Sequence, residues 1–177
     1  NRGVNSSNNN IFLIGLMGAG KSTVGKVLAK KLGRRFLDAD HVIEERCGVK
    51  IPVIFEMEGE DGFRKREAQV IEEITNEPGI ILATGGGAVL LPENRLALKE
   101  RGTVIYLHAN PVELWHRTKG GEGRPLLKNG DARKILENLY AIRDPLYREI
   151  ADYVVETGKP SVNQLVNTLI MQLELSA

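Results

Sequence analysis

The sequence predicts a three-layer α/β/α fold built on a five-stranded parallel sheet. Short apolar runs alternate with longer segments in which apolar residues recur at helical spacing, and this alternation is typical of parallel sheets with helical crossovers. The first apolar run leads into a glycine-rich loop and then at once into a helical pattern. The 177 residues suit one such domain, and no internal repeat or long linker divides them.

The composition excludes several classes of partner. The 24 basic and 23 acidic residues nearly cancel, so no overall field attracts nucleic acid or anionic lipid. No apolar run approaches the roughly 20 residues that a bilayer span requires. We therefore expect neither nucleic acid nor a membrane as a partner. The single cysteine, Cys47, has no second cysteine to pair with and favours a reducing, cytoplasmic compartment.

The chain is expected to begin with a disordered tail and to continue as one folded domain. Residues 1–10 are polar and aperiodic, which predicts a tail, and the domain is expected to span residues 11–177. Its first strand is Ile11 to Ile14, which is entirely apolar.

The loop after this strand carries a phosphate-binding motif. Residues 15–22 match G-x-x-x-x-G-K-[ST] at every defined position. The glycines allow a sharp turn that presents backbone N–H groups to an anion, and the dipole of the following helix points to the same place. Lys21 can reach the β and γ phosphates of a nucleotide, and the Ser22 hydroxyl is placed to bind its Mg²⁺. The residues expected to contact the nucleotide are Gly18, Ala19, Gly20, Lys21, Ser22 and Thr23.

Two aspartates follow the second predicted strand, Arg34 to Asp38. The carboxyl end of a strand beside a phosphate loop is where open α/β sheets bind ligands. Asp38, nearer the strand end, is predicted to hold Mg²⁺. Asp40 is expected either to orient and deprotonate an acceptor hydroxyl or to cap a helix that starts near His41, and the residues alone leave both roles open.

The next segment is predicted to be helical but broken. Gly48 and Pro52 interrupt the helical pieces between residues 41 and 58, which favours a region that shapes a pocket. A firmer helix is predicted from Glu60 to Asn76. Arg64 lies at the edge of its apolar stripe within a run of charges, and such a run alone favours a solvated face.

Three glycines follow the third predicted strand, Gly79 to Ala83. The sequence Gly85-Gly86-Gly87 implies a very close approach by a ligand or another backbone, and we favour a ligand. A surface helix, Pro92 to Arg101, and a fourth strand, Thr103 to Leu107, come next. Asn110-Pro111 then opens a further helix.

The last third of the chain contains a predicted lid. Residues 119–130 are rich in glycine and basic residues, which favours a lid that closes over phosphates rather than a plain connecting loop. Asp131 is predicted to cap the following helix and Asp144-Pro145 to start another, which places Arg143 at a junction between helices. A fifth strand, Tyr153 to Val155, and an amphipathic helix from about Val162 complete the pattern.

Six segments together resemble the shikimate kinases. The chain lacks both the Asn-Lys-x-Asp element that reads guanine and the apolar strand ending in Asp-Glu that motor ATPases carry, so a kinase of small molecules remains. The segments keep the order and approximate spacing of that family from Ile11 to about Leu173. They are Gly15 to Thr23, Asp38-Ala39-Asp40, Phe63-Arg64, Gly85-Gly86-Gly87, Arg124-Pro125-Leu126-Leu127 and Arg143-Asp144-Pro145-Leu146-Tyr147.

This resemblance implies a nucleoside monophosphate kinase-like fold with strand order 2-3-1-4-5. It implies transfer of phosphate from ATP, with Mg²⁺, to the 3-hydroxyl of shikimate in aromatic amino acid biosynthesis. It also implies a substrate-binding region at about residues 39–67, a lid at about 117–130, and a monomer.

The resemblance further implies roles for single residues. Asp40 would contact the acceptor hydroxyls, and Arg64 and Arg143 would hold the shikimate carboxylate. Residues Gly85, Gly86 and Gly87 would line the same pocket.

On the donor side, the resemblance implies that Arg117 lies near the adenine and that Arg124, on the lid, reaches the transferring phosphate. Catalysis is then expected to depend on Lys21, Asp40 and Arg124, because phosphoryl transfer is accelerated by alignment and charge stabilisation.

Two alternatives remain at this stage. One is another small-molecule kinase, acting on gluconate or a nucleotide, although a carboxylate-free sugar would have no use for paired arginines. The other is a nucleotide-dependent regulatory module without turnover, which the presence of Lys21, Ser22, Asp38, Asp40 and Arg124 disfavours.

Overall fold

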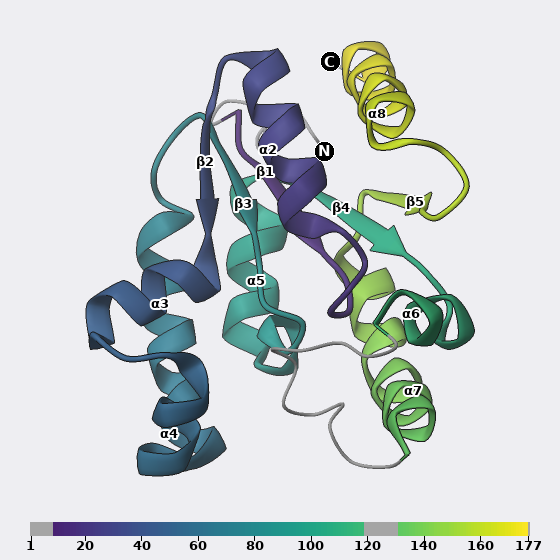
Figure 1. Ribbon diagram of the computed structural model, residues 1–177. Helices are drawn as coiled ribbons and strands as arrows, with labels where there is room; N and C mark the ends of the chain where they lie inside the picture. The colour runs from purple at the N-terminus through teal and green to yellow at the C-terminus, as the bar shows by residue number, and fades with distance from the viewer. Residues whose placement is uncertain (1–8, 119–130, 177) are drawn as a thin grey trace.

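The computed structural model describes residues 9–118 and 131–176. In this part of the chain five strands form one parallel sheet with the order β2-β3-β1-β4-β5 (Figure 1). The strands are β1 (Ile11–Ile14), β2 (Arg35–Asp38), β3 (Ile80–Ala83), β4 (Thr103–His108) and β5 (Tyr153–Glu156). The helices are α2 (Lys21–Leu32), α3 (Ala39–Cys47), α4 (Ile51–Ile74), the short 3₁₀ helix η1 (Ala88–Leu90), α5 (Pro92–Arg101), α6 (Pro111–Thr118), α7 (Ala132–Ile150) and α8 (Val162–Ser176). The predicted fold class and strand order are confirmed.

Helices cover both faces of the sheet. Helix α2 lies on one face together with α8, and α5 lies on the other, where it packs between α4 and α7 (Figure 1). Because both faces are covered, every residue of β1 and β3 is buried, which explains why these strands read as unbroken apolar runs. The connections after β1 and β3 leave toward opposite faces, and such a point in a parallel sheet opens a crevice at the carboxyl ends of the strands.

Asn10 belongs to the folded domain, which corrects the predicted end of the tail. Its side chain is 2% exposed. The amide nitrogen donates to the carbonyl of Glu77 at 2.7 Å, and the amide oxygen accepts from the N–H of Ile80 at 2.9 Å. An asparagine can satisfy several buried backbone groups at once, so Asn10 ties the start of β1 to the entrance of β3. Residues 1–8 lie outside the described part.

Helices α3 and α4 form the broken region that the sequence predicts. Gly48, with φ 76°, ends α3. Pro52 lies in the first turn of α4 and so begins this helix rather than interrupting it. The break lies instead at Gly59, whose φ of 72° and ψ of −179° turn the chain between two helical halves of α4.

Helix α7 is continuous, so the predicted junction at Arg143 is wrong. The helix runs from Ala132 to Ile150 with Pro145 inside it. The proline removes one backbone hydrogen bond, but one buried stripe continues on both sides of it, with Leu136 before it and Tyr147 after it. Arg143 therefore lies on the buried face of an unbroken helix, and packing of that face outweighs the local signal to stop.

The predicted caps of two helices are present. Asp131 accepts from the N–H of Lys134 at the start of α7, and Asn110 accepts from the N–H of Glu113 at the start of α6. No helix in residues 9–118 and 131–176 is both long and apolar enough to cross a bilayer.

Candidate active site

The phosphate loop lies at the carboxyl end of β1, in the middle of the sheet. Gly15 has a φ of 149°, and a Cβ atom there would lie 2.7 Å from the carbonyl oxygen of Leu107 on β4. Gly20 has a φ of 100° at the N-cap of α2. Both positions therefore require glycine. The Lys21 ammonium donates to the carbonyls of Gly15 and Leu16, so its charge lies over the loop.

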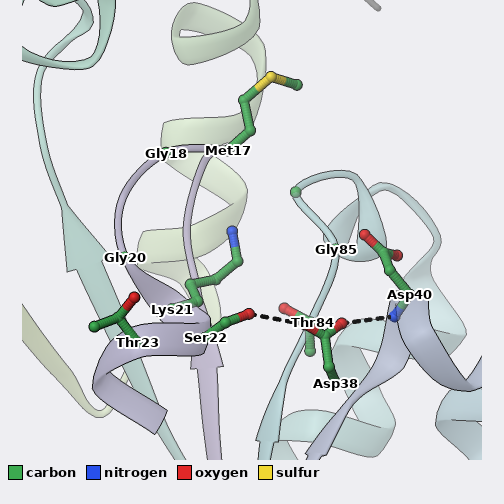
Figure 2. Close-up of a pocket in the computed structure, with 11 residues that line it drawn as sticks. Met17, Gly18, Gly20, Lys21, Ser22, Thr23, Asp38, Asp40, Thr84 and Gly85 are labelled. Carbon is green, nitrogen blue, oxygen red and sulfur yellow. Dashed lines mark hydrogen bonds between the residues drawn. The ribbon is translucent and has the colours of Figure 1, made fainter. Parts of the chain in front are cut away.

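A cavity of about 390 Å³ opens above this loop. In Figure 2, Lys21, Ser22 and Thr23 lie on one side and Asp38, Asp40 and Gly85 on the other. The cavity thus joins the ends of β1, β2 and β3. Its lining residues are Met17, Gly18, Gly20, Lys21, Ser22, Thr23, Asp38, Asp40, Thr84, Gly85 and Gly86. Five of the predicted nucleotide residues, Gly18 and Gly20 to Thr23, are brought together with both aspartates. Met17 and Thr84 also line the cavity and were not predicted from the sequence.

Asp38 joins the phosphate loop to α3. Its Oδ2 accepts a hydrogen bond of 2.8 Å from the Ser22 hydroxyl, and its Oδ1 accepts from the N–H groups of Asp40 and His41 (Figure 2). Asp38 is therefore the N-cap of α3. The alternative in which Asp40 caps this helix is wrong, since the helix begins at Ala39, two residues before His41.

Asp40 is left available for chemistry. Its Oδ1 is buried and has no hydrogen-bond partner among the described residues. Burial raises the pKa of this carboxyl, the charges of Asp38 and Glu44 add to the rise, and Lys21 and Arg64 oppose it. A buried polar atom without a partner is costly unless something else supplies a hydrogen bond. The substituents of a bound hydroxylated molecule would do so.

The three glycines after β3 make room for charged side chains. A Cβ atom at Gly85 would lie 2.8 Å from Asp40 Oδ1, and one at Gly87 would lie within 2.6 Å of the Arg64 guanidinium carbon. At Gly86 the nearest atom would be Arg143 Nη1 at 3.3 Å. Each glycine thus lies against a different charged group. The close neighbours are thus side chains of this chain rather than another backbone, and the favoured contact with a ligand stays a prediction.

Arg64 does not lie on a solvated face, contrary to what its charge run alone favours. Its side chain is 13% exposed and pairs with Glu67 at 2.8 Å. Glu67 is fully buried, and its second oxygen has no partner among the described residues. Burial raises the pKa of Glu67 and the charge of Arg64 lowers it. Phe63 lies under the guanidinium, 5.1 Å from it to the ring centre.

Arg143, on α7, also lies against the glycine turn, next to Arg64. It is 7% exposed, and burial lowers its pKa, as does the charge of Arg64, while Tyr147 and Glu60 oppose the shift. Two guanidinium groups that repel each other in a buried site are stabilised by an anion between them, and a carboxylate accepts hydrogen bonds from both.

A second cavity, of about 270 Å³, lies beyond the phosphate loop. Arg117 crosses it, donating to Thr157 Oγ1 at 2.9 Å and to the carbonyl of Gly18 at 3.2 Å. The residues that line this second cavity are Gly18, Ala19, Gly20, Thr23, Val24, Arg117, Thr157, Gly158, Pro160, Val162 and Leu165. Sequence analysis named Arg117 but missed Thr157, because a threonine in a loop carries no signal of its own.

Arg124 and the predicted lid from residue 119 to residue 130 lie outside the described residues. Those expectations stay predictions.

The fold and the site together define a P-loop kinase of small molecules. The phosphate loop faces an acceptor side formed by Asp40, Arg64 and Arg143, which come from α3, α4 and α7. A family model described as shikimate kinase matches residues 17–174, and the chain belongs to the shikimate kinase family.

Individual relatives agree with this assignment. The chain is 62% identical over 167 residues to a shikimate kinase of Burkholderia lata, with 94% of this chain and 91% of the relative covered. Its structure is similar to that of shikimate kinase from Acinetobacter baumannii in complex with shikimate, with a TM-score of 0.89, 50% identity, and 94% and 93% coverage. The structure of shikimate kinase from Aquifex aeolicus gives a TM-score of 0.80 at 36% identity, with 93% and 96% coverage.

Proposed function

We propose that this protein transfers the γ phosphate of ATP to the 3-hydroxyl of shikimate. The observation that carries the proposal is the convergence of Arg64 and Arg143 on the glycine turn, on the acceptor side of the phosphate loop. Shikimate offers one carboxylate for the two arginines and hydroxyls for Asp40. Membership of the shikimate kinase family, and the shikimate bound to the Acinetobacter relative, support the same substrate.

The acceptor would be oriented from both ends. Arg64 and Arg143 would hold the carboxylate through paired hydrogen bonds, and Gly85, Gly86 and Gly87 would let the ring approach the backbone. Asp40 Oδ1 would accept the hydrogen bond of the reacting hydroxyl and take its proton late in the transfer, since phosphoryl transfer passes through a loose transition state.

The donor would lie along the two cavities. Residues Gly18, Ala19, Gly20 and Thr23 would surround the phosphates, and Arg117 would lie beside the adenine. Lys21 would move from the loop carbonyls onto the β and γ phosphates, and Arg124 would add charge at the transferring group.

The residues present fit a magnesium ion that arrives with the nucleotide. Ser22 Oγ and Asp38 Oδ2, 2.8 Å apart, offer two oxygen ligands. No group of three or more His, Cys, Asp or Glu side chains within residues 9–118 and 131–176 could hold a metal by itself, so phosphate oxygens and water would complete the coordination. When bound, the ion neutralises charge on the phosphates.

We also propose a substrate-binding region at about residues 39–67, a lid at about 117–130, and a monomer working in the cytoplasm. Asp40 and Arg64 support the first of these, because both belong to this region and both lie against the glycine turn.

The decisive experiment measures ADP release by the purified protein with ATP and Mg²⁺. We expect release only when shikimate is added, and no comparable rate with gluconate, nucleoside monophosphates or carboxylate-free sugars. Release without shikimate, or turnover of one of the other acceptors instead, would contradict the proposal.

A further inference from the structure

Tyr147 is buried in the middle of the acceptor side, and none of the proposed roles uses it. It lies on α7, one turn after Arg143, so both side chains are on the same face of the helix. Its side chain is 0% exposed. Its hydroxyl donates a hydrogen bond of 2.5 Å to the carbonyl oxygen of Gly86. Helix α7 is thereby attached to the glycine turn by a side chain other than that of Arg143.

Gly86 is the residue at which three parts of the site meet. A Cβ atom there would lie 3.3 Å from Arg143 Nη1 and 3.6 Å from the backbone nitrogen of Met17 in the phosphate loop. Gly86, whose carbonyl accepts from Tyr147, therefore lies close to both the acceptor arginine and the phosphate loop. A shift of this peptide would change the distance between the two substrates' binding groups.

The environment of Tyr147 keeps its hydroxyl a donor. Burial raises the pKa of the phenol, while the charge and hydrogen bond of Arg143 oppose the rise. A protonated phenol has one hydrogen to give, and the carbonyl of Gly86 receives it.

Tyr106, on β4, packs against Tyr147 and offers a matched control. The ring centres of Tyr106 and Tyr147 are 4.8 Å apart. Tyr106 is 1% exposed, and its hydroxyl donates to Asp144 at 2.7 Å instead of to the glycine turn. Both residues donate a hydrogen bond from a buried phenol ring, and they differ in the group that accepts it.

We propose that Tyr147 is a positioning residue that holds the Gly86 peptide, and through it sets the spacing between Arg143 and the phosphate loop. The inference rests on the proposed function only for the identity of the acceptor. Removing the hydroxyl leaves the buried carbonyl of Gly86 without its donor, and the turn then relaxes toward another partner.

The test compares Tyr147→Phe with Tyr106→Phe in the full chain. Hydrogen–deuterium exchange of peptides covering residues 84–91, without any ligand, should be faster in Tyr147→Phe and unchanged in Tyr106→Phe. In Tyr147→Phe, KM for shikimate should rise about five- to tenfold, with KM for ATP little changed. A purely structural role would lower Tm in both variants and leave both KM values alone.

The outcomes separate the two proposals. Wild-type protein that releases no ADP with shikimate contradicts the proposed function, and the exchange measurement still decides the role of Tyr147. Unchanged exchange in the glycine turn of Tyr147→Phe overturns the inference, as does an equal rise of KM for shikimate in both variants.

Discussion

On the acceptor side, the type of residue at each position depends on the space, hydrogen bonds and charge that neighbouring side chains require. The glycines of the turn after β3 have no side chains because Asp40 and two guanidinium groups occupy the space that Cβ atoms would need. Asp40 in turn is free because Asp38 takes the capping role at α3. Glu67, which has the helical spacing of a core position, supplies the charge that lets Arg64 be buried.

Replacing Arg143 should separate acceptor binding from donor binding. In Arg143→Ala we expect KM for shikimate to rise by roughly 30- to 100-fold, because a buried charge-assisted pair with a carboxylate is lost. KM for ATP should change little. Arg133→Ala is the control, since Arg133 lies on the same helix, is exposed and pairs with Glu137. Equal losses for both substrates in Arg143→Ala would contradict the assigned role.

Gly87→Ala should impair binding more than folding. Gly87 has a φ of −96°, which alanine adopts without strain, and the atoms that a Cβ would meet belong to the flexible end of Arg64. The guanidinium would be displaced, so we expect KM for shikimate to rise about tenfold, the cost of a weakened charged hydrogen bond. Thermal unfolding should stay near that of the wild type. A large fall in Tm with unchanged KM would show that the contact is structural.

The raised pKa of Asp40 predicts opposite effects of pH on activity and stability. The ionised form accepts the proton, so kcat/KM for shikimate should fall as pH drops through a value above the usual range of aspartate. For folding, a raised pKa means that the native state binds the proton more tightly. The contribution of Asp40 to stability is therefore greatest below the unfolded pKa of about 3.9 and is lost as pH rises through the native pKa.

The variant Asp40→Asn tests both the predicted effect on activity and the predicted effect on stability. It should lose activity at every pH, and near pH 7 it should unfold at a higher temperature than the wild type, because a buried charge is removed. A lower Tm at neutral pH would contradict the sign of the shift.

At the scale of the elements, two of the helices that form the acceptor side each contain a residue that favours a break in the helix. Helix α4 turns at Gly59, and the ring of Phe55 before the turn packs on Phe63 after it, with centres 4.8 Å apart. Helix α7 keeps its buried face past Pro145. In both cases a local signal to break the helix is present, and packing decides whether the break occurs.

Gly59→Ala should destabilise this part of the fold. A φ of 72° with a ψ of −179° is open almost only to glycine, and other residues there cost about 1–3 kcal/mol. Urea unfolding should show that loss, while Asp61→Ala, at an exposed position two residues later, should change stability little. An unchanged midpoint in Gly59→Ala would show that the turn relaxes without cost.

At the scale of the whole molecule, the donor and acceptor sites share the carboxyl edge of one sheet. The second cavity joins the phosphate loop to Arg117 on α6 and to Thr157 after β5, so a nucleotide would bridge elements from both halves of the chain. Ligands that bind only the folded state stabilise it by mass action.

Nucleotide binding should therefore raise the unfolding temperature. ADP with Mg²⁺ at 100 times its Kd should add about 2.7 kcal/mol, or roughly 5–10 °C in Tm for a domain of this size. EDTA should remove much of the effect and abolish turnover, since Ser22 and Asp38 need the ion to engage the phosphates. A Tm shift with ADP that EDTA leaves intact would contradict the proposed metal site.

The sequence by itself determined the elements and the donor side. Apolar runs of strand length, helical spacing and the phosphate-loop motif are local signals, and they were sufficient for the alternating layout and for the positions of Lys21 and Ser22. The resemblance to shikimate kinases added the strand order and the names of the acceptor residues.

Only the tertiary structure decided what the acceptor residues touch. Arg64, Glu67, Arg143 and Tyr147 come from two helices far apart in the chain, and charged or aromatic residues at helical spacing look the same on a solvated face as in a buried site. The same holds for the continuity of α7 and for the burial of Asn10. Each depends on which groups lie opposite, and that depends on contacts between segments distant in the sequence.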